Sequence, residues 1–292
     1  MNRKNKDIGW YLLFTLPLLT VFTIVVIVPF FIGIRYSFFE WDGMALNPRI
    51  FVGFDNFLRL PSDQHFINSA VITTLFTVVS VISINLLGLI FALIATSKLR
   101  VRNIGRTMLF MPYLIGGLIL GYIWRFILRD VMQTIGEITG WEGIFVNWFL
   151  DPTLAFWGMV VVATWQMAGY IMIIYITGLQ SISDEVIEAA NVDGASYWQT
   201  LLRIRFPLLM PSFTICLFMT LNHCFRIFDV NLALTGGGPA RATVMFAMNI
   251  HQEIFALNNY GYGQAKAIVF FLIVALVTLF QVRMTKKREV MM

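Results

Sequence analysis

Polar side chains interrupt two otherwise apolar segments of this chain, and their types suit the binding of a small polar molecule. Amide, hydroxyl and charged groups can hydrogen-bond to hydroxyl groups, and aromatic rings can cover C–H surfaces. Polar groups deep in an apolar helix are costly, so they mark a site or a pathway by default. The first segment carries Trp165, Gln166 and Tyr170, and the second carries Asn222, His223, Arg226 and Asp229.

Each of these residues also has an ordinary structural role open to it. Gln166 lies four residues from Tyr170, on the same face of a helix, but it could simply bridge two helices. The aromatic residues of the first segment could anchor it at a membrane surface, and His223 could bridge helices. Arg226 and Asp229 are three residues apart, so they could pair with each other or mark the end of a helix.

Catalytic spacings are absent from the sequence. Its three histidines, His65, His223 and His251, form no H-E-x-x-H pattern, and no G-x-S-x-G pattern occurs. A phosphate-binding G-x-x-x-x-G-K-[ST] loop is also missing, because the Gly236–Pro239 stretch lacks the lysine. A membrane-embedded enzyme is therefore a weak alternative, and the chain cannot hydrolyse ATP by itself.

Composition places the chain in a membrane. It is 58% hydrophobic and only 13% charged, with a mean hydropathy of +0.76, far from the range of soluble domains. The sequence pI of about 9.3 therefore need not indicate nucleic-acid binding. The two cysteines, Cys216 and Cys224, lie within an apolar segment and are expected to be small apolar packing residues rather than a disulfide or metal ligands.

Six apolar segments are long enough to cross a bilayer as helices, which takes about 20 residues. Prolines at 17 and 29 are expected to bend the first segment, and Pro112 with Gly116 and Gly117 interrupts the third. The first is too long for a signal peptide and is expected to be retained. Long loops are predicted between the first and second helices and over 231–262. The predicted helices are Ile8–Ile34, Phe66–Ser97, Thr107–Leu128, Leu154–Gln180, Leu208–Asp229 and Gly263–Val282.

Basic residues orient these helices. With an even number of helices both termini lie on one side, and cytoplasmic segments carry an excess of lysine and arginine. Of the 21 such residues, thirteen lie in the N-terminal tail, the hook described below, the C-terminal tail and a short loop that contains Lys98, Arg100, Arg102 and Arg106. These segments, and both termini, are therefore predicted to be cytoplasmic.

The polar stretch 181–211 has the pattern of two short helices joined by a bend, and we call it the hook. Ser183 can cap the first helix, with acidic residues in its first turn. Gly194 is placed to end that helix, because glycine tolerates the left-handed conformation. A second helix is expected over Tyr197–Arg205, and Pro207 is expected to restart the chain into the membrane.

The hook resembles the EAA loop of permease subunits in binding-protein-dependent ABC importers. That pattern is Glu-Ala-Ala, three residues, Gly, nine residues, then Ile-x-Leu-Pro, and the chain departs from it only at Phe206, where leucine is usual. The residues that the resemblance assigns to contact with the ATPase are Glu188, Ala189, Ala190, Asp193, Gly194, Ile204 and Pro207.

Two further stretches resemble carbohydrate permeases of the maltose-type branch. They are Leu234–Pro239, followed by Ala242-Thr243, and Tyr260–Ala265. The resemblance covers most of the chain from about Ile67 and is weaker before it. It implies an all-α integral membrane protein with six transmembrane helices and a cytoplasmic coupling loop, the fold of type I importer permeases. The expected division is 1–66 for the tail, first helix and first external loop, 67–283 for the core, and 284–292 for a basic tail.

The resemblance also implies partners and a substrate. The expected complex, in a bacterial plasma membrane, contains a second and different permease, two ATPases that carry the ATP and magnesium, and an extracellular binding protein that delivers a di- or oligosaccharide. This chain would bind no cofactor. In the maltose-type family, turns equivalent to those around Gln166 and Asn222 line the transport cavity. If Arg226 is unpaired, an acidic sugar or glycerol phosphate is expected, and if Asp229 neutralises it, a neutral sugar. An ATP-independent secondary transporter is a further alternative.

Overall fold

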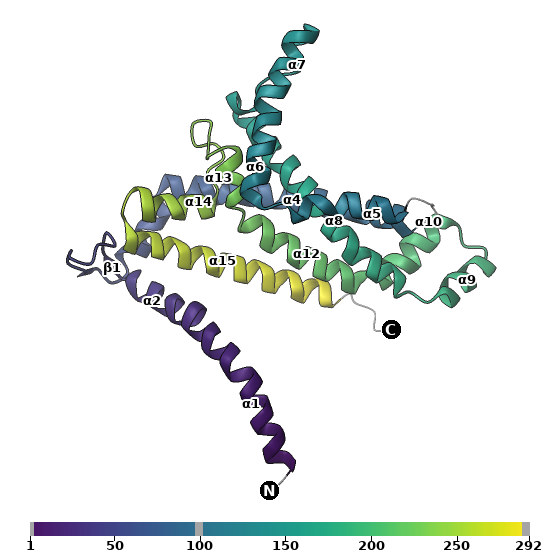
Figure 1. The fold of residues 1–292 in the computed structure, drawn as a ribbon, viewed down its shortest axis with the longest axis horizontal. Helices are drawn as coiled ribbons and strands as arrows, with labels where there is room; N and C mark the ends of the chain where they lie inside the picture. The colour runs from purple at the N-terminus through teal and green to yellow at the C-terminus, as the bar shows by residue number, and fades with distance from the viewer. Residues whose placement is uncertain (1–2, 97–101, 288–292) are drawn as a thin grey trace. The chain divides into compact units, whose positions relative to one another are not determined.

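The computed structural model describes residues 3–96 and 102–287, and most of its regular structure is helical (Figure 1). The predicted cytoplasmic residues Lys98 and Arg100 lie outside the described residues, and so does the part of the predicted basic tail from Arg288 to Met292. Contacts divide the chain into two compact units. The smaller unit comprises Met1–Gln64 and Ile250–Phe270, and the larger one His65–Asn249 and Phe271–Met292.

The smaller unit begins with a long helical run and a short β ribbon. In the ribbon Phe39 pairs with Phe51, and Asn56 fastens the turn by donating to the carbonyls of Ser37 and Phe39 at 2.9 and 3.0 Å. Helices α14 and α15 each cross a boundary between the units. The elements are α1 (Arg3–Phe22), η1 (Thr23–Ile27), α2 (Val28–Tyr36), β1 (Phe39–Glu40), β2 (Ile50–Phe51), α3 (Asp55–Arg59), η2 (Leu60–Ser62), α14 (Phe246–His251), η7 (Gln252–Ala256) and α15 (Tyr260–Lys286).

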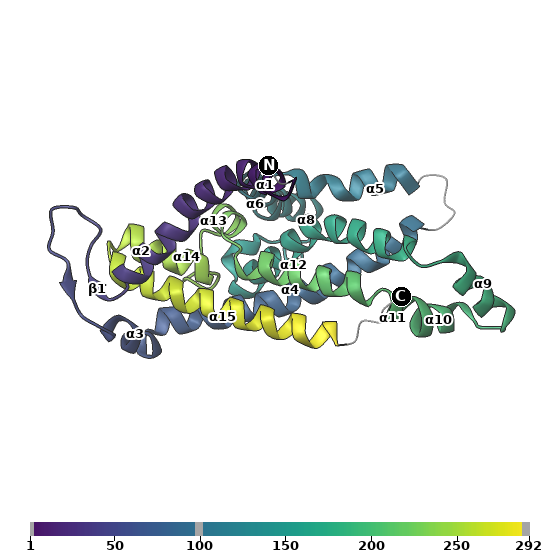
Figure 2. The same cartoon turned by 90° about the horizontal axis from the view of Figure 1, so that it is seen from below.

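The larger unit is built on three long helices, α4 (Gln64–Thr96), α8 (Pro152–Gln180) and α12 (Met210–Phe225). Helices α8 and α12 run side by side (Figures 1 and 2). The remaining elements are α5 (Arg102–Phe110), η3 (Met111–Leu114), α6 (Gly117–Phe126), η4 (Ile127–Val131), α7 (Met132–Thr139), η5 (Trp148–Leu150), α9 (Asp184–Val192), α10 (Tyr197–Thr200), η6 (Leu201–Arg205), α11 (Phe206–Leu208) and α13 (Asp229–Leu234).

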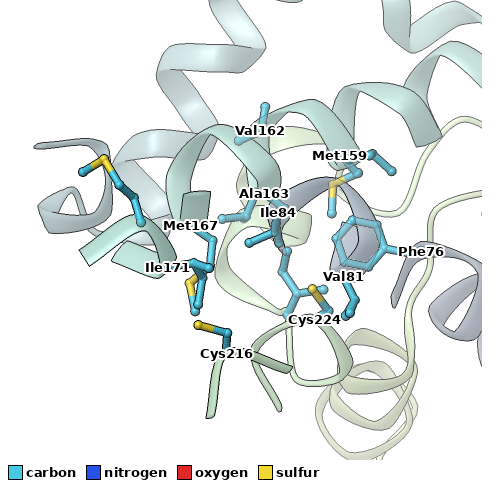
Figure 3. Packing of buried hydrophobic residues seen from close by; sticks show 14 of the residues in the cluster. Phe76, Val81, Ile84, Met159, Val162, Ala163, Met167, Ile171, Cys216 and Cys224 are labelled. Atoms are coloured by element: carbon cyan, nitrogen blue, oxygen red, sulfur yellow. The ribbon is translucent and has the colours of Figure 1, made fainter. Parts of the chain in front are cut away.

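An apolar core joins the three long helices (Figure 3). Ile84 of α4, Ile171 of α8 and Cys216 of α12 are fully buried in it, and Cys224 lies there too. Both cysteines are free thiols, as expected from their apolar surroundings. Lipid tails are as apolar as these side chains, so close packing rather than the hydrophobic effect has to hold such helices together.

A buried polar network supplements that packing. The Tyr175 hydroxyl of α8 donates to Asn85 Oδ1 of α4 at 2.9 Å, and Asn85 Nδ2 donates to the Thr220 hydroxyl of α12 at 3.0 Å. Gly169 permits a close approach on another side of α8, because a Cβ there would lie 1.8 Å from the carbonyl oxygen of Leu109. These contacts fix α8, the helix that carries Gln166, against its neighbours.

The helices long and apolar enough to cross a membrane agree with the predicted class. Four qualify within the described residues, namely 13–36, 64–96, 152–180 and 260–286. Two bent pairs raise the number to six if each is one span: 103–114 with 117–139, bent by 100°, and 197–208 with 210–225, bent by 68°. The first bend lies where Pro112 and Gly116 were expected to interrupt the third helix.

Several predicted boundaries are wrong. Helical structure after the first bend continues to Thr139, where it was expected to end at Leu128. The fifth helix ends at Phe225 rather than Asp229, and Asp229 begins the separate helix α13. The predicted loop 231–262 contains most of α13, all of α14 and η7 and the start of α15. These short helices are less apolar than a span, so hydropathy alone did not separate them from loops.

The hook differs from its prediction in where it breaks. Its second helical stretch runs through Pro207 to Leu208, and the chain bends at Leu209. A proline at the first turn of a new helical piece is tolerated, because its missing N–H would have no partner there. Ser183 precedes α9 as predicted, but its side chain makes no capping hydrogen bond.

Candidate functional site

A cavity of about 360 Å³ in the larger unit brings together five of the seven predicted site residues. Helices α6, α8, α12 and α13 supply lining residues, and the end of α12, the start of α13 and their connection form much of the wall. The lining residues are Gly117, Gln166, Asn222, His223, Arg226, Ile227, Phe228, Asp229 and Val230. Its volume falls within the range of about 300–1,000 Å³ typical of small-molecule sites.

Gln166 is positioned from the middle of α8 by the break in the neighbouring helix. That break leaves the carbonyl of Ile115 outside a regular helix, and Gln166 Nε2 donates to it at 3.2 Å. The side chain is 7% exposed. Its carbonyl oxygen, Oε1, is buried and has no hydrogen-bond partner in the part of the chain that the structure describes. Gln166 is therefore a lining residue of the cavity with one acceptor atom that no described residue satisfies.

The end of α12 supplies two further polar groups. Asn222 donates to the carbonyl of Phe218 at 2.8 Å, within its own helix. The Nε2 atom of His223 is buried and, among the described residues, makes no hydrogen bond. Gln166 and His223 therefore each bring to the lining of this cavity a polar atom that has no hydrogen-bond partner among the described residues.

The two charged residues of the cavity lie beyond α12. Arg226 follows the last helical residue, with φ of −97°, and Asp229 is the first residue of α13. Across the described ranges 3–96 and 102–287, no ion pair joins them. Both side chains line the cavity and are exposed, so it holds one positive and one negative charge that are each able to contact a ligand.

Trp165 and Tyr170, the other two predicted residues, are placed elsewhere. Tyr170 stacks on Tyr113 with ring centroids 4.4 Å apart, and Trp165 packs edge-to-face on Trp124 at 5.4 Å. Trp165 also lines a second, mostly apolar cavity of about 400 Å³. Helical spacing places Gln166 and Tyr170 on one side of α8, but the lining of the polar cavity includes only Gln166.

Four lining residues had no polar signal in the sequence, among them Gly117 and Phe228. A Cβ on Gly117 would lie 3.0 Å from Cβ of Asp229, so this glycine lets α6 approach α13 closely. Phe228 contributes an aromatic side chain from the connection between α12 and α13. The Gly116-Gly117 pair predicted a helix interruption. Its contact with Asp229, more than a hundred positions away, could not be predicted from the sequence.

The hook projects α9 and α10 from one end of the larger unit (Figure 2). Gly194 has φ of +75°, as its predicted role requires, and the N–H of Ala195 closes the end of α9 on the carbonyl of Ala190 at 3.0 Å. The second helical stretch begins at a capping box, in which Ser196 and Gln199 each accept the other's backbone N–H. The bend between α9 and α10 is therefore formed by a left-handed glycine with a hydrogen-bonded helix end on each side.

Most of the predicted hook residues are exposed. Glu188, Ala189, Asp193 and Gly194 are exposed, Ile204 and Pro207 are half-buried, and Ala190 is buried. Large apolar side chains around them are also exposed: Val192 by 87%, Trp198 by 67% and Leu202 by 61%. An exposed cluster of apolar groups beside charged ones is typical of a protein–protein contact.

Comparisons with known proteins identify the family of this chain. Residues 84–290 match the family described as "Binding-protein-dependent transport system inner membrane component". A probable starch degradation products transport permease, AmyD of Thermoanaerobacterium thermosulfurigenes, is 46% identical over 97% of this chain and 96% of its own. The sn-glycerol-3-phosphate permease UgpA of Agrobacterium fabrum is 33% identical over 85% of this chain and 84% of its own.

The fold is also similar to a solved structure. A chain of a bacterial ABC transporter for import of the acidic polysaccharide alginate superposes with a TM-score of 0.83, over 98% of this chain and 99% of the other, at 23% identity. The family match spans more than half of the chain, and the helical membrane architecture is the same. The chain therefore belongs to the binding-protein-dependent inner membrane components, the multi-pass permease subunits of ABC importers.

Proposed function

We propose that this chain is the permease of a sugar importer, and that its substrate is a neutral di- or oligosaccharide handed over by an extracellular binding protein. The observation that carries the proposal is the convergence of five polar side chains on one cavity. The relative named for starch degradation products, 46% identical, supports the same class of substrate.

The cavity suits hydroxyl groups better than an ion. Gln166 Oε1 and His223 Nε2 have no hydrogen-bond partner among the described residues, and both atom types can hydrogen-bond to a sugar hydroxyl. Arg226 and Asp229 add charged partners, whose hydrogen bonds are roughly twice as strong as neutral ones. Although the two side chains form no ion pair in the described structure, they line the same cavity and their formal charges sum to zero, which favours a neutral ligand with many hydroxyls over an anion.

The experiment is uptake by the complete complex in proteoliposomes, with ATP inside and loaded binding protein outside. A panel of labelled neutral glucans is offered alongside glycerol phosphate and a uronic-acid oligosaccharide. We expect ATP-dependent uptake of a neutral glucan. Uptake that persists without ATP would instead support a secondary transporter.

An anionic substrate is the second candidate, and a specific observation favours it. Arg226 makes no ion pair with Asp229 in the described structure, so it is available to an anion. The relative named for sn-glycerol-3-phosphate shows that similar permeases serve such solutes. Under this alternative Arg226→Ala abolishes uptake of the anion, whereas a variant that transports anionic and neutral sugars normally would exclude Arg226 from recognition.

The proposed coupling site is the hook. Glu188, Ala189, Ala190, Asp193, Gly194, Ile204 and Pro207 would fit a groove on a cytoplasmic ATPase, with the exposed Val192 and Trp198 nearby. ATP binding would then favour one of two arrangements of the helices, because the ATPase pair contacts the hook differently when it closes. The proposed complex has two ATPases, a second and different permease, and cytoplasmic termini on this chain.

A further inference from the structure

A buried ion triad stands apart from the cavity and the hook. Lys266 is fully buried, and its Nζ lies 2.7 Å from Glu253 Oε2 and 2.8 Å from Asp63 Oδ2. All three residues belong to the smaller unit. Lysine is almost never fully buried unless it is paired, and here two carboxylates share it.

A second layer of contacts surrounds the triad. The Tyr262 hydroxyl donates to Asp63 Oδ2 at 2.8 Å, and Asn259 Nδ2 donates to Glu253 Oε1 at 2.8 Å. Two cations lie near the Tyr262 ring. Lys266 Nζ is 4.6 Å from the ring centroid, and the Arg59 guanidinium carbon is 4.5 Å from the same centroid. Both carboxylates are thus held by the lysine and by a neutral donor as well.

The triad ties together three segments that are distant in sequence. Asp63 follows η2, Glu253 lies in η7, and Lys266 lies in α15, about 9 Å along the helix from its first residue at 1.5 Å per residue. Helix α15 then continues without a break to Lys286. A displacement of the Asp63 or Glu253 segment is therefore applied to the second turn of α15, a helix without a break.

The same contacts support the wall of a cavity in the smaller unit. This cavity, of about 470 Å³, has Arg59, Asn259 and Tyr262 in its lining, and all three touch the triad or its tyrosine. Carboxylates at Glu40, Asp42 and Asp55 line it as well. The Met44 N–H, and then the Asn47 amide, hold the pKa of Asp42 below its usual value, so this carboxylate stays ionised.

We propose that Lys266 is a positioning residue for transport: it joins the walls of this cavity to α15, so that a binding protein docking on them acts on the last helix. The inference rests on the proposed function, because it requires an external binding protein and an ATPase that responds to it. No contact between Lys266 and the sugar is involved.

The test compares three variants in the reconstituted complex, measuring ATP hydrolysis with and without loaded binding protein. Lys266→Met alone leaves two carboxylates buried without their cation. The triple variant Lys266→Met, Glu253→Gln, Asp63→Asn removes all three charges and keeps similar shapes, a type of change that buried ion sites often tolerate. Lys266→Arg keeps the charge. Arg129→Gln, which breaks the exposed Arg129–Asp130 pair, is the matched control.

In the triple variant, hydrolysis without binding protein stays at the wild-type rate, and stimulation by binding protein falls at least about fivefold, the lower range of couplings between sites. Lys266→Arg retains more of the stimulation than Lys266→Met, and the control retains all of it. Equal loss of both rates in the triple variant, or full stimulation in it, overturns the proposal. A wild-type complex that binding protein never stimulates contradicts the proposed function instead.

Discussion

Gln166 donates one amide hydrogen to the carbonyl of Ile115, and its own carbonyl oxygen has no hydrogen-bond partner among the described residues. Gln166 is thus anchored to the neighbouring backbone by its amide nitrogen while its side chain lines the cavity. Tyr170 offers a comparison on the same helix. Its ring is stacked on Tyr113 and does not line the cavity, although helical spacing alone assigns it to the same face.

Gln166→Leu is expected to weaken substrate recognition and leave the complex assembled. One neutral hydrogen bond contributes about 0.5–1.5 kcal/mol, so the sugar concentration for half-maximal uptake should rise by about two- to tenfold. Uptake across a range of sugar concentrations measures this, and co-purification of the partner subunits checks assembly. Tyr170→Phe is the control and should transport normally. Unchanged uptake in Gln166→Leu would remove that residue from the site.

At the scale of the element, the bend of the hook depends on a glycine with free space around it. Gly194 has φ of +75°, and a Cβ there would meet nothing within 4 Å. A side chain would therefore cause backbone strain without a clash. For a β-branched residue in the left-handed region that strain is about 1–3 kcal/mol.

Gly194→Val is accordingly expected to release or uncouple the ATPase. Gly194→Asn should retain coupling, because asparagine tolerates the left-handed conformation. The measurement is the amount of ATPase that co-purifies with the permease, together with sugar-dependent ATP hydrolysis. Full activity of the valine variant would show that the bend is not required where the structure has it.

The two serines that precede the hook's helices form a second matched pair. Ser196 takes part in a capping box, whereas the Ser183 side chain caps nothing. Loss of such a cap costs about 1 kcal/mol. Ser196→Ala should therefore speed amide hydrogen exchange over α10 about fivefold, and Ser183→Ala should change exchange over α9 little. Equal effects of the two substitutions would contradict the assigned caps.

Local sequence patterns predicted the long helices. They did not predict features that depend on contacts between residues far apart in the sequence. The spans were visible because twenty apolar residues are a local signal, and Gly194 because its spacing from Glu188 is local too. The helix that ends at Thr139 is short and partly polar, although Gly140, with φ of +72°, was an available end signal. The Lys266 triad joins positions about 200 residues apart, which no local pattern connects.

At the scale of the whole molecule, burial within the described structure does not explain the apolar sequence of the first span. None of its most apolar window is buried, although it is as apolar as the spans that are partly covered. Segment 64–96 has 39% of its window buried, and 152–180 has 72%. The sequence of α1 through α2 is therefore suited to lipid or to a neighbouring subunit, and hydropathy predicted its existence without predicting its partner.

Cys216 and Cys224 are fully buried, so neither native thiol is accessible to thiol-labelling reagents in the folded chain. A membrane-impermeant maleimide should leave the natural protein unmodified, so a single added cysteine reports which side of the membrane it faces without removal of either native thiol. Ser183→Cys should react only from the cytoplasmic side and Ser62→Cys only from the outer side, since both positions are exposed. The reverse pattern would invert the orientation predicted from the basic residues.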